Sequence, residues 1–428
     1  MDSKNFLFVT LDALCVDVAW QVSREGHRVK MYVDSDASQD VGDGLIEKVE
    51  DWKKEVDWAD VVVFDDVLGL GAKADRLRRT GKAVIGGTAY TDQLEDDRGF
   101  GQEELKKHGI PILSYQTFAD FDEAIAYVRA HPGRYVFKPS GEAANLKRLL
   151  FVGTEDDGSD VIGIMEAYKR VWLKKIKVFQ LQKHVSGVEV AVGAFFNGSR
   201  FLSPININFE HKKLFPGNLG ISTGEMGTSM YWSEPNRLFN ATLLKMEETL
   251  SREGYVGYFD LNCIVNGNGI YPLEFTSRFG YPTISIQHEG LLMPMSELLY
   301  RLANRESFAI KTKKGFQVGV RLRTPPYPFD DHKAFETYSK DAAIYLRRNT
   351  LDGIHIEEVK VLNGQWVVAG HAGAVMTVAG TGATMKAAQQ QVYNRVQNVM
   401  VPNMYYRTDI GDRWERDSDL LHNWGYLR

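Results

Sequence analysis

The chain has little of what secreted and membrane proteins depend on. Its 428 residues include two cysteines, Cys15 and Cys263, which are far apart in sequence. They form no disulfide framework and suit a reducing compartment. No window approaches eighteen uninterrupted apolar residues, and no basic region followed by a long apolar run opens the chain. These absences predict a cytoplasmic protein without a transmembrane segment.

Positive charge is not in excess either. The formal net charge is −5, so nothing favours a nucleic acid or an acidic membrane as a partner. Hydrophobic residues make up 44% and charged residues 25% of the chain, which is typical of a globular protein. The length predicts two to four domains.

The first part of the chain alternates short apolar runs with helical spacing. The apolar runs cover residues 6–9, 29–33, 61–64 and 83–86. Strands that alternate with helices predict a parallel α/β layer, and continuous apolar runs fit strands buried on both faces. We therefore expect an N-terminal parallel α/β domain over residues 1–93.

After residue 93 the pattern changes to helices and antiparallel-looking strands. Helical spacing covers residues 100–108, 121–130 and 385–399. Strand patterns cover residues 135–138, 178–184, 188–196, 258–265, 269–275, 317–323, 359–362 and 366–369. We expect a central domain over residues 94–312 and a mixed α+β domain over residues 313–428. No low-complexity linker separates the parts, so they should pack as one body.

The most informative segment covers residues 271–280. Alternation places Glu274, Thr276 and Arg278 on one face of a strand and its exit, and Asp260 and Asn262 share one face of the preceding strand. Pairing the two strands would bring oxygen ligands together, and Mg²⁺ binds a few such oxygens together with water and phosphate. An ordinary hairpin with polar residues on its solvent face is the alternative.

Three further segments carry candidate binding residues. Lys138 ends an apolar strand before a loop of small residues that reaches Lys147, where backbone N–H groups could cradle phosphate. A surface lysine is the alternative for Lys138. An apolar strand leads into a polar linker at residues 179–189 and could present backbone groups to adenine. Residues 217–227 hold four glycines, which predicts an irregular loop of the kind that often carries function.

In this order, these segments resemble the glycinamide ribonucleotide synthetase family (phosphoribosylamine–glycine ligases) of ATP-grasp enzymes. The stretches that resemble the family's entry to its ATP-grasp domain are residues 94–100 and 107–111. Residues 182–189 are similar to the adenine hinge "EEFLxGEE", residues 210–213 and 222–227 to "DHKR…NTGGMGA", and residues 273–280 to "LEFNxRFGDPE". Residues 371–373 and 406–411 resemble the C-terminal "HAG" and "RxDIG" signatures.

The resemblance implies a fold and a reaction. The fold is a parallel α/β domain, an ATP-grasp domain with a small lid subdomain over about residues 113–187, and a C-terminal mixed domain. ATP would phosphorylate a carboxylate, which in the family is that of glycine. An amine, which in the family is phosphoribosylamine of purine synthesis, would then attack the acyl phosphate. The implied cofactors are ATP and Mg²⁺ or Mn²⁺, the partners are small-molecule amino acid and amine substrates, and the protein would be a monomer or small homo-oligomer.

The resemblance also implies roles for particular residues. ATP-binding residues would be Arg98, Lys138, Lys147, Gln182, Lys183, Val185 and Glu189, with Glu189 on the ribose. Metal ligands would be Glu274, Asp260, Asn262 and Thr276. Substrate-binding residues would be Glu210, Lys212, Lys213, Thr223, Gly224 and Arg278. Arg278 and Lys138 would be catalytic, because a guanidinium suits a planar carboxylate or acyl phosphate and an ammonium suits phosphates.

The N-terminal part differs from the family. Its members open with "GxGGREHA", which helps to hold the phosphoribosyl substrate, whereas residues 10–17 contain neither glycine nor arginine. Residues 65–70 replace the family's "GPExPL" loop and begin with Asp65 and Asp66, whose charge would repel a phosphate. Tyr281 and Thr283 replace the acids that follow the family's "RFG".

Two alternatives to the family reaction stay open. The first is an ATP-grasp ligase that joins an amino acid to a different amine, with Arg321 and Arg323 in a changed acceptor pocket. The second is a catalytically inactive nucleotide-binding protein. It is suggested by Arg98, which stands where the family has lysine, and by Thr276, which stands where the family has asparagine.

Overall fold

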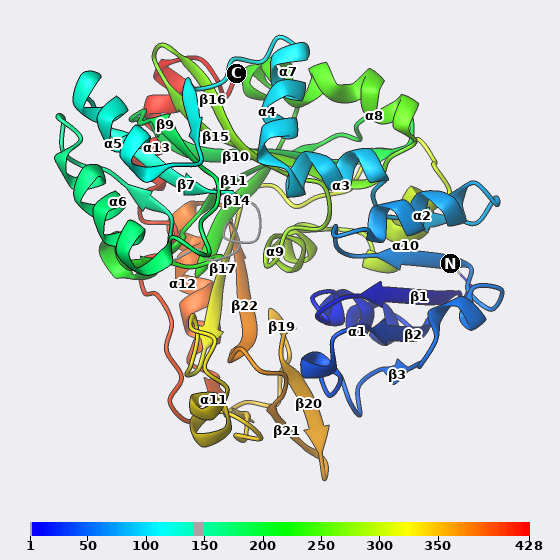
Figure 1. Cartoon of the computed structure of the whole chain (residues 1–428). Coiled ribbons are helices and arrows are strands. Elements are labelled where there is room, and N and C mark those ends of the chain that lie inside the picture. The colour runs from blue at the N-terminus through cyan, green and yellow to red at the C-terminus, as the bar shows by residue number, and fades with distance from the viewer. Residues whose placement is uncertain (1, 141–148) are drawn as a thin grey trace.

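A parallel five-stranded sheet forms the N-terminal part of the computed structural model, which describes residues 2–140 and 149–428 (Figure 1). The strand order is β3-β2-β1-β4-β5. The bounds are β1 (Asn5–Thr10), β2 (Arg28–Val33), β3 (Glu47–Lys48), β4 (Val61–Phe64) and β5 (Val84–Ile85). All of β4 is buried, as its continuous apolar sequence predicts. The predicted parallel α/β arrangement is confirmed.

Helices connect these strands and lead out of the sheet. They are α1 (Val16–Arg24), α2 (Leu70–Arg78), α3 (Ala89–Asp96) and α4 (Arg98–Lys107). The side chain of Asp97 accepts a hydrogen bond from the Phe100 N–H and so caps α4. This cap fixes Arg98 as the first residue of the helix.

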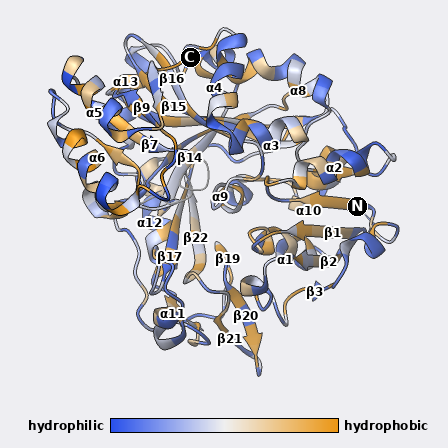
Figure 2. Ribbon diagram, in the orientation of Figure 1, coloured by the Kyte–Doolittle hydropathy of each residue, from blue (hydrophilic) through white to orange (hydrophobic). Residues whose placement is uncertain are grey.

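A small four-stranded sheet lies apart from the parallel sheet and has its own core. Its order is β6-β9-β7-β8, with β6 (Tyr115–Phe118), β7 (Tyr135–Pro139), β8 (Phe151–Val152) and β9 (Phe179–Lys183). Helices α5 (Phe121–Ala130) and α6 (Ser159–Trp172) pack on it, and Phe121, Phe137 and Phe179 stack in the core. Figure 2 colours α6 with both hydrophobic and hydrophilic segments, as expected of a helix with one buried face.

An eight-stranded antiparallel sheet runs through the rest of the molecule in the order β16-β15-β10-β11-β14-β17-β22-β19. The bounds are β10 (Val188–Asn197), β11 (Ile205–Glu210), β14 (Gly227–Ser233), β15 (Val256–Asn266), β16 (Gly269–Thr276), β17 (Phe316–Arg323), β19 (Ile354–Ile356) and β22 (Ala374–Gly382). The sheet continues across the expected domain boundary at residue 312, because β14 pairs with β17. Figure 1 shows the small sheet and the parallel sheet on opposite sides of it.

The remaining elements surround this sheet. They are β12 (Lys213–Phe215), β13 (Leu219–Ser222), β18 (Tyr345–Leu346), β20 (Val359–Leu362), β21 (Gln365–Val368), β23 (Val399–Met400), α7 (Arg237–Ala241), α8 (Glu247–Glu253), α9 (Thr283–Gly290), α10 (Met295–Ala303), α11 (His332–Tyr338), α12 (Met385–Val396) and α13 (Trp414–Asn423). Within the described residues, no helix combines the length and apolar character needed to cross a membrane.

Two local expectations were wrong. Residues 217–227 form an irregular loop only in part, because residues 219–222 are β13 and pair with β12 in a short antiparallel hairpin. Gly217 lies in the turn and Gly220 within β13, both with positive φ. The helix expected over residues 385–399 ends at Val396, because Val399 already pairs with Leu346 in a two-stranded sheet.

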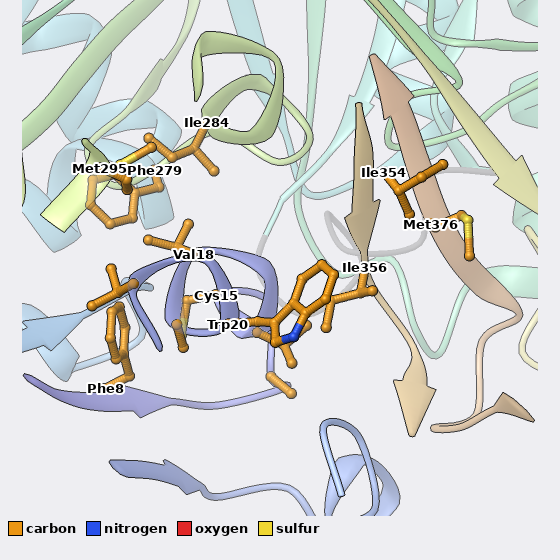
Figure 3. Packing of buried hydrophobic residues seen from close by; sticks show 14 of the residues in the cluster. Phe8, Cys15, Val18, Trp20, Phe279, Ile284, Met295, Ile354, Ile356 and Met376 are labelled. Carbon is orange, nitrogen blue, oxygen red and sulfur yellow. The ribbon is translucent and has the colours of Figure 1, made fainter. Parts of the chain in front are cut away.

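One apolar core joins the parallel sheet to the C-terminal part of the chain. Figure 3 shows Val18 and Trp20 of α1 lying between Phe8 of β1 and two residues from later in the chain, Ile284 and Ile356. All five side chains are buried. Burial of this kind contributes roughly 1.5–3 kcal/mol for each large apolar side chain, so the N-terminal domain is packed firmly against the rest.

A buried ion-pair network lies within the same contact region. His355 Nδ1 lies 2.8 Å from Asp17 Oδ2 and its Nε2 lies 3.6 Å from Glu289 Oε1, while Arg395 Nη1 lies 3.0 Å from Glu289. Burial by itself lowers the pKa of His355, but the neighbouring carboxylates raise it to about 10, so the ring is a cation. The network joins α1, α9, β19 and α12.

Replacing His355 by Gln should therefore lower the free energy of unfolding by about 3–5 kcal/mol near pH 6, since the buried Asp17 loses its cation and Glu289 keeps only Arg395. The folded-state pKa of His355 lies above its ordinary value of 6.5. Its stabilisation is thus complete below about pH 6.5 and is lost as the pH rises towards 10. Urea unfolding at pH 6 and pH 9.5 measures this difference.

The matched control is His332→Gln, since His332 is exposed on α11, and it should change the free energy of unfolding by less than about 0.5 kcal/mol. A destabilisation by His355→Gln that stays constant from pH 6 to 9.5 would contradict a charged His355.

Candidate active site

The hairpin of β15 and β16 supplies oxygen-bearing side chains in two registered pairs. Asn262 lies opposite Glu274 and Asp260 lies opposite Thr276. Asp260 and Asn262 are two residues apart and therefore point to the same face of the strand. The structure thus brings together the side chains that the sequence placed on one face.

The ammonium group of Lys212 lies among three carboxylates from different strands. Its Nζ is 3.0 Å from Glu189 Oε1, 3.2 Å from Glu210 Oε2 and 3.3 Å from Glu274 Oε1. Asn262 Nδ2 also donates to Glu210 Oε2 at 3.0 Å. Burial by itself lowers the pKa of Lys212, but the carboxylates raise it well above its ordinary value. Lys212 is therefore a permanent cation that holds β10, β11 and β16 side chains together.

Lys212 is positioned by the hairpin that follows it. Thr223 donates to the Lys212 carbonyl from both its backbone N–H and its hydroxyl, each at 2.8 Å. Next to it, Gly224 is open to space, with no atom within 4 Å of where a Cβ would lie. Lys213 begins β12, and its carbonyl accepts a hydrogen bond from Arg407. Thr223 thus fixes the backbone of Lys212, while Gly224 leaves the adjacent space free.

A second group of cations faces this cluster from the small sheet and α4. Lys138 of β7 is buried, with 7% exposure. Its pKa falls to about 7, mainly through burial and then through the nearby Arg98 guanidinium, although Glu274, close enough to interact, opposes the shift. Burial likewise lowers the pKa of Arg98, and the Glu274 carboxylate opposes this shift. The basic side chains of Lys138 and Arg98 therefore approach the carboxylate of Glu274 from the small sheet and α4.

The predicted adenine-binding segment lies at the edge of the same region. Gln182 is buried in β9, opposite Tyr115 and Val136 of the neighbouring strands. Lys183 is exposed and Val185 is half-buried. Lys147 lies outside the described residues.

Arg278 is placed differently from the substrate-facing position that the resemblance implied. Its Nε lies 3.1 Å from Asp66 Oδ1 and 3.0 Å from Glu95 Oε1, so in this structure its guanidinium is paired with two carboxylates from the N-terminal part. Sequence reasoning missed Glu95, which also accepts a hydrogen bond from the Ser277 N–H. The acidic helix α3 gave no signal for this contact.

Part of the hairpin fits a metal ion. The Oδ1 atom of Asn262 is buried and accepts no hydrogen bond from the described residues, and it belongs to the residue registered opposite Glu274. One carboxylate and one amide oxygen suit Mg²⁺, which takes its other ligands from water and phosphate. Within the described residues there is no cluster of three or more His, Cys, Asp or Glu side chains that could hold a metal. The Asp260 carboxylate instead accepts hydrogen bonds from Asn208 and Tyr258, and burial raises its pKa to about 8.

Residues 96–284 match the family model of the phosphoribosylglycinamide synthetase ATP-grasp (A) domain, and residues 318–413 match the model of the phosphoribosylglycinamide synthetase C domain. A phosphoribosylamine–glycine ligase of Streptococcus pneumoniae is 26% identical over 357 residues, 82% of each chain. That of Halalkalibacterium halodurans is 24% identical over 418 residues, 92% of this chain and 94% of the other.

Solved structures share the fold. The phosphoribosylamine–glycine ligase of Thermotoga maritima superposes with a TM-score of 0.71 at 20% identity, covering 95% of this chain and all of the other. The biotin carboxylase domain of 2-oxoglutarate carboxylase from Hydrogenobacter thermophilus, solved with MgADP and bicarbonate, gives a TM-score of 0.63 at 13% identity. It covers 99% of this chain and 96% of that domain.

The ion pairs around Lys212 should contribute to the free energy of unfolding. Lys212→Met leaves three carboxylates close together without a cation, so it should lower the free energy of unfolding at pH 7 by about 2 kcal/mol. Lys213→Met is the matched control, because the neighbouring lysine makes no ion pair among the described residues, and it should stay within about 0.5 kcal/mol of the wild type. Equal urea midpoints for the two variants would contradict the role given to Lys212.

Proposed function

The chain belongs to the phosphoribosylglycinamide synthetase family, and from this membership we propose that it activates a carboxylate as an acyl phosphate and transfers the acyl group to an amine. It is an ATP-grasp ligase that forms C–N bonds, most like the phosphoribosylamine–glycine ligases of purine synthesis. The observation that carries the proposal is the meeting of Lys138 and Arg98 with the carboxylate cluster around Lys212.

The two sides of the site take different parts of the nucleotide. Lys138 and Arg98 bind the phosphates, because the buried Lys138 and the half-buried Arg98 lie close together where charge interacts strongly. Gln182, Lys183 and Val185 present backbone groups to the adenine. The Glu189 carboxylate, held by Lys212, accepts hydrogen bonds from the ribose hydroxyls. Lys147 belongs with the phosphate-binding residues by its place in the sequence.

Glu274 and the free Oδ1 of Asn262 would hold the divalent cation, Mg²⁺ or Mn²⁺, with Asp260 and Thr276 beside them in register. When bound, the ion neutralises charge on the phosphates during transfer. Asp260 already accepts two hydrogen bonds in the protein and has a raised pKa. We therefore give it a supporting role beside the two main ligands.

The reaction has two steps. A carboxylate oxygen attacks the γ-phosphorus and the bond to ADP breaks, which gives an acyl phosphate. The amine nitrogen then attacks the acyl carbon, the C–N bond forms, the C–O bond to phosphate breaks, and inorganic phosphate and a proton leave. Phosphoryl transfer of this kind asks the protein mainly for position and charge. We assign Glu210, Lys212, Lys213, Thr223 and Gly224 to the substrate side of this centre, and Arg278 would join them only by leaving Asp66 and Glu95.

The acyl phosphate must be kept from water. The small sheet, expected as a lid over about residues 113–187, carries Lys138 and lies beside the large sheet (Figure 1), where a closing element could exclude water from the site. The substrates are a small amino acid and an amine, and the protein works in the cytoplasm as a monomer or a small homo-oligomer.

Hydroxylamine offers a direct test of the first step, because it converts an acyl phosphate into a stable hydroxamate. With Mg-ATP and glycine, or another amino acid of a panel, hydroxamate should form together with ADP. Glu274→Ala should lower this rate at least about a hundredfold, since one charge-stabilising group is worth roughly 2.7–4 kcal/mol. Lys177→Met, an exposed position ahead of β9, should retain it. ADP release without any hydroxamate would overturn the acyl phosphate, and full activity of Glu274→Ala would overturn the metal assignment.

Proton uptake tests the role of Lys138. With a pKa of about 7 in the free protein, Lys138 is mostly neutral at pH 8, whereas bound phosphates favour its ammonium form. Binding of Mg-ATP at pH 8 should therefore take up a proton at Lys138. Calorimetry in two buffers of different ionisation enthalpy should show this uptake in the wild type and in Lys177→Met but lose it in Lys138→Met. Equal uptake in all three proteins would contradict phosphate binding by Lys138.

A further inference from the structure

A cavity of about 160 Å³ lies where the N-terminal part meets the large sheet. Its wall comes from the loop between β1 and α1, the start of α9, and residues near β17, β19 and β22. Its polar lining includes Asp12, Ser285, Arg321, Glu357, Glu358 and His371. The cavity lies next to the candidate active site, because Arg321 donates to the carbonyl of Glu225 and the Glu225 side chain interacts with Lys212.

The arginines around the cavity are already paired with carboxylates. Arg321 Nε lies 3.2 Å from Glu357 Oε1, and Arg323 Nη1 lies 2.8 Å from Glu357 Oε2. Arg278 is held by Asp66 and Glu95. Recognition of a phosphate group relies on cations or N–H groups that are free to face it. Among the described residues that line the cavity, no lysine is present and the arginine is already paired.

The helix terminus beside the cavity is also occupied by the protein's own acids. The N-terminus of a helix that follows a strand of a parallel sheet is a common phosphate site. Here the N–H of Cys15, the residue just before α1, donates to Asp65 Oδ2 at 2.9 Å, and Tyr281 from the cavity wall donates to the same oxygen at 3.4 Å. Asp17 in the first turn carries a second carboxylate. A phosphate would meet these carboxyl groups at this position and find the Cys15 N–H already bonded.

Glu225 lies beside the cavity, because its backbone carbonyl accepts a hydrogen bond from Arg321 of the cavity wall. Its side chain is buried, with 5% exposure, and its Oε1 accepts no hydrogen bond from the described residues. It lies within electrostatic reach of Glu210 and Lys212 on one side and of Arg321 on the other. An amine that approaches the acyl phosphate could donate a hydrogen bond to this oxygen. The family motif that residues 222–227 resemble has glycine where this chain has Glu225.

We propose that this cavity binds the acceptor of the ligase reaction, that the acceptor is a primary amine without a phosphate group, and that Glu225 is the residue that selects it. The inference rests on the proposed function, because it names the second substrate of the same site. Asp12 and Glu358 add negative charge to the wall, which favours a cationic or hydroxylated amine over an anionic one.

The test compares acceptors under conditions in which the first step is already measured by hydroxamate formation. The wild type is given Mg-ATP, the amino acid that yields most hydroxamate, and either putrescine, ethanolamine, glucosamine or phosphoribosylamine generated in place. The amide product is measured by mass spectrometry. At least one unphosphorylated amine should give a kcat/KM about tenfold or more above that of phosphoribosylamine. A preference for phosphoribosylamine, or no amide from any of the three unphosphorylated amines, would overturn the inference.

Variants of Glu225 separate selection from catalysis. Glu225→Gly should lower kcat/KM for the unphosphorylated amine by about tenfold or more, as loss of a buried hydrogen bond does. The more conservative Glu225→Gln keeps a side-chain oxygen that can accept, so it should lower kcat/KM less. Hydroxamate formation should change less than about twofold. The control Glu248→Gln, on an exposed face of α8, should leave both unchanged. Unaltered amine use in both Glu225 variants would remove Glu225 from acceptor recognition, whereas loss of hydroxamate in the wild type would instead refute the proposed function.

Discussion

The ammonium group of Lys212 is the interaction on which the site depends. It lies within 3.3 Å of the carboxylates of Glu189, Glu210 and Glu274, and without it three negative side chains from separate strands would repel one another in a partly buried space. The strands of the large sheet give these residues their positions, but the lysine allows them to converge. The carboxylates in turn provide a negative wall opposite Lys138 and Arg98. A triphosphate is bound by cations and its metal ion by carboxylates, so a site for both needs the two kinds of side chain opposite each other.

A buried cation between carboxylates also joins the domains. His355 is a buried cation between Asp17 and Glu289, and the apolar core around α1 packs against segments from much later in the chain (Figure 3). The N-terminal sheet is therefore held rigidly against the large sheet. The cavity proposed for the acceptor forms between them, from a loop of the first and strand ends of the second. Its chemistry can change through a few loop residues while the nucleotide side keeps its arrangement.

Most strands were predictable from the sequence because each is a local apolar run. The runs at residues 61–64 and 188–196 became β4 and β10, since strands in the interior of a sheet bury side chains whatever their partners are. The hairpin of β12 and β13 was missed, because its glycines signal a turn without showing what pairs across it. The early end of α12 was missed for a related reason, since Val399 pairs with a strand about fifty residues earlier.

For the site, the sequence by itself determined which residue types are present and which of them share a strand face. It placed Asp260 with Asn262 and Glu274 with Thr276, because alternation along a strand is a local rule. Only the tertiary structure decided that Lys212 lies among three carboxylates, that Arg278 is paired with Asp66 and Glu95, and that Asp65 occupies the N-terminus of α1. These contacts join residues from different strands, helices and loops. Charge pairing depends on distance in space, and the order of residues along the chain does not contain that distance.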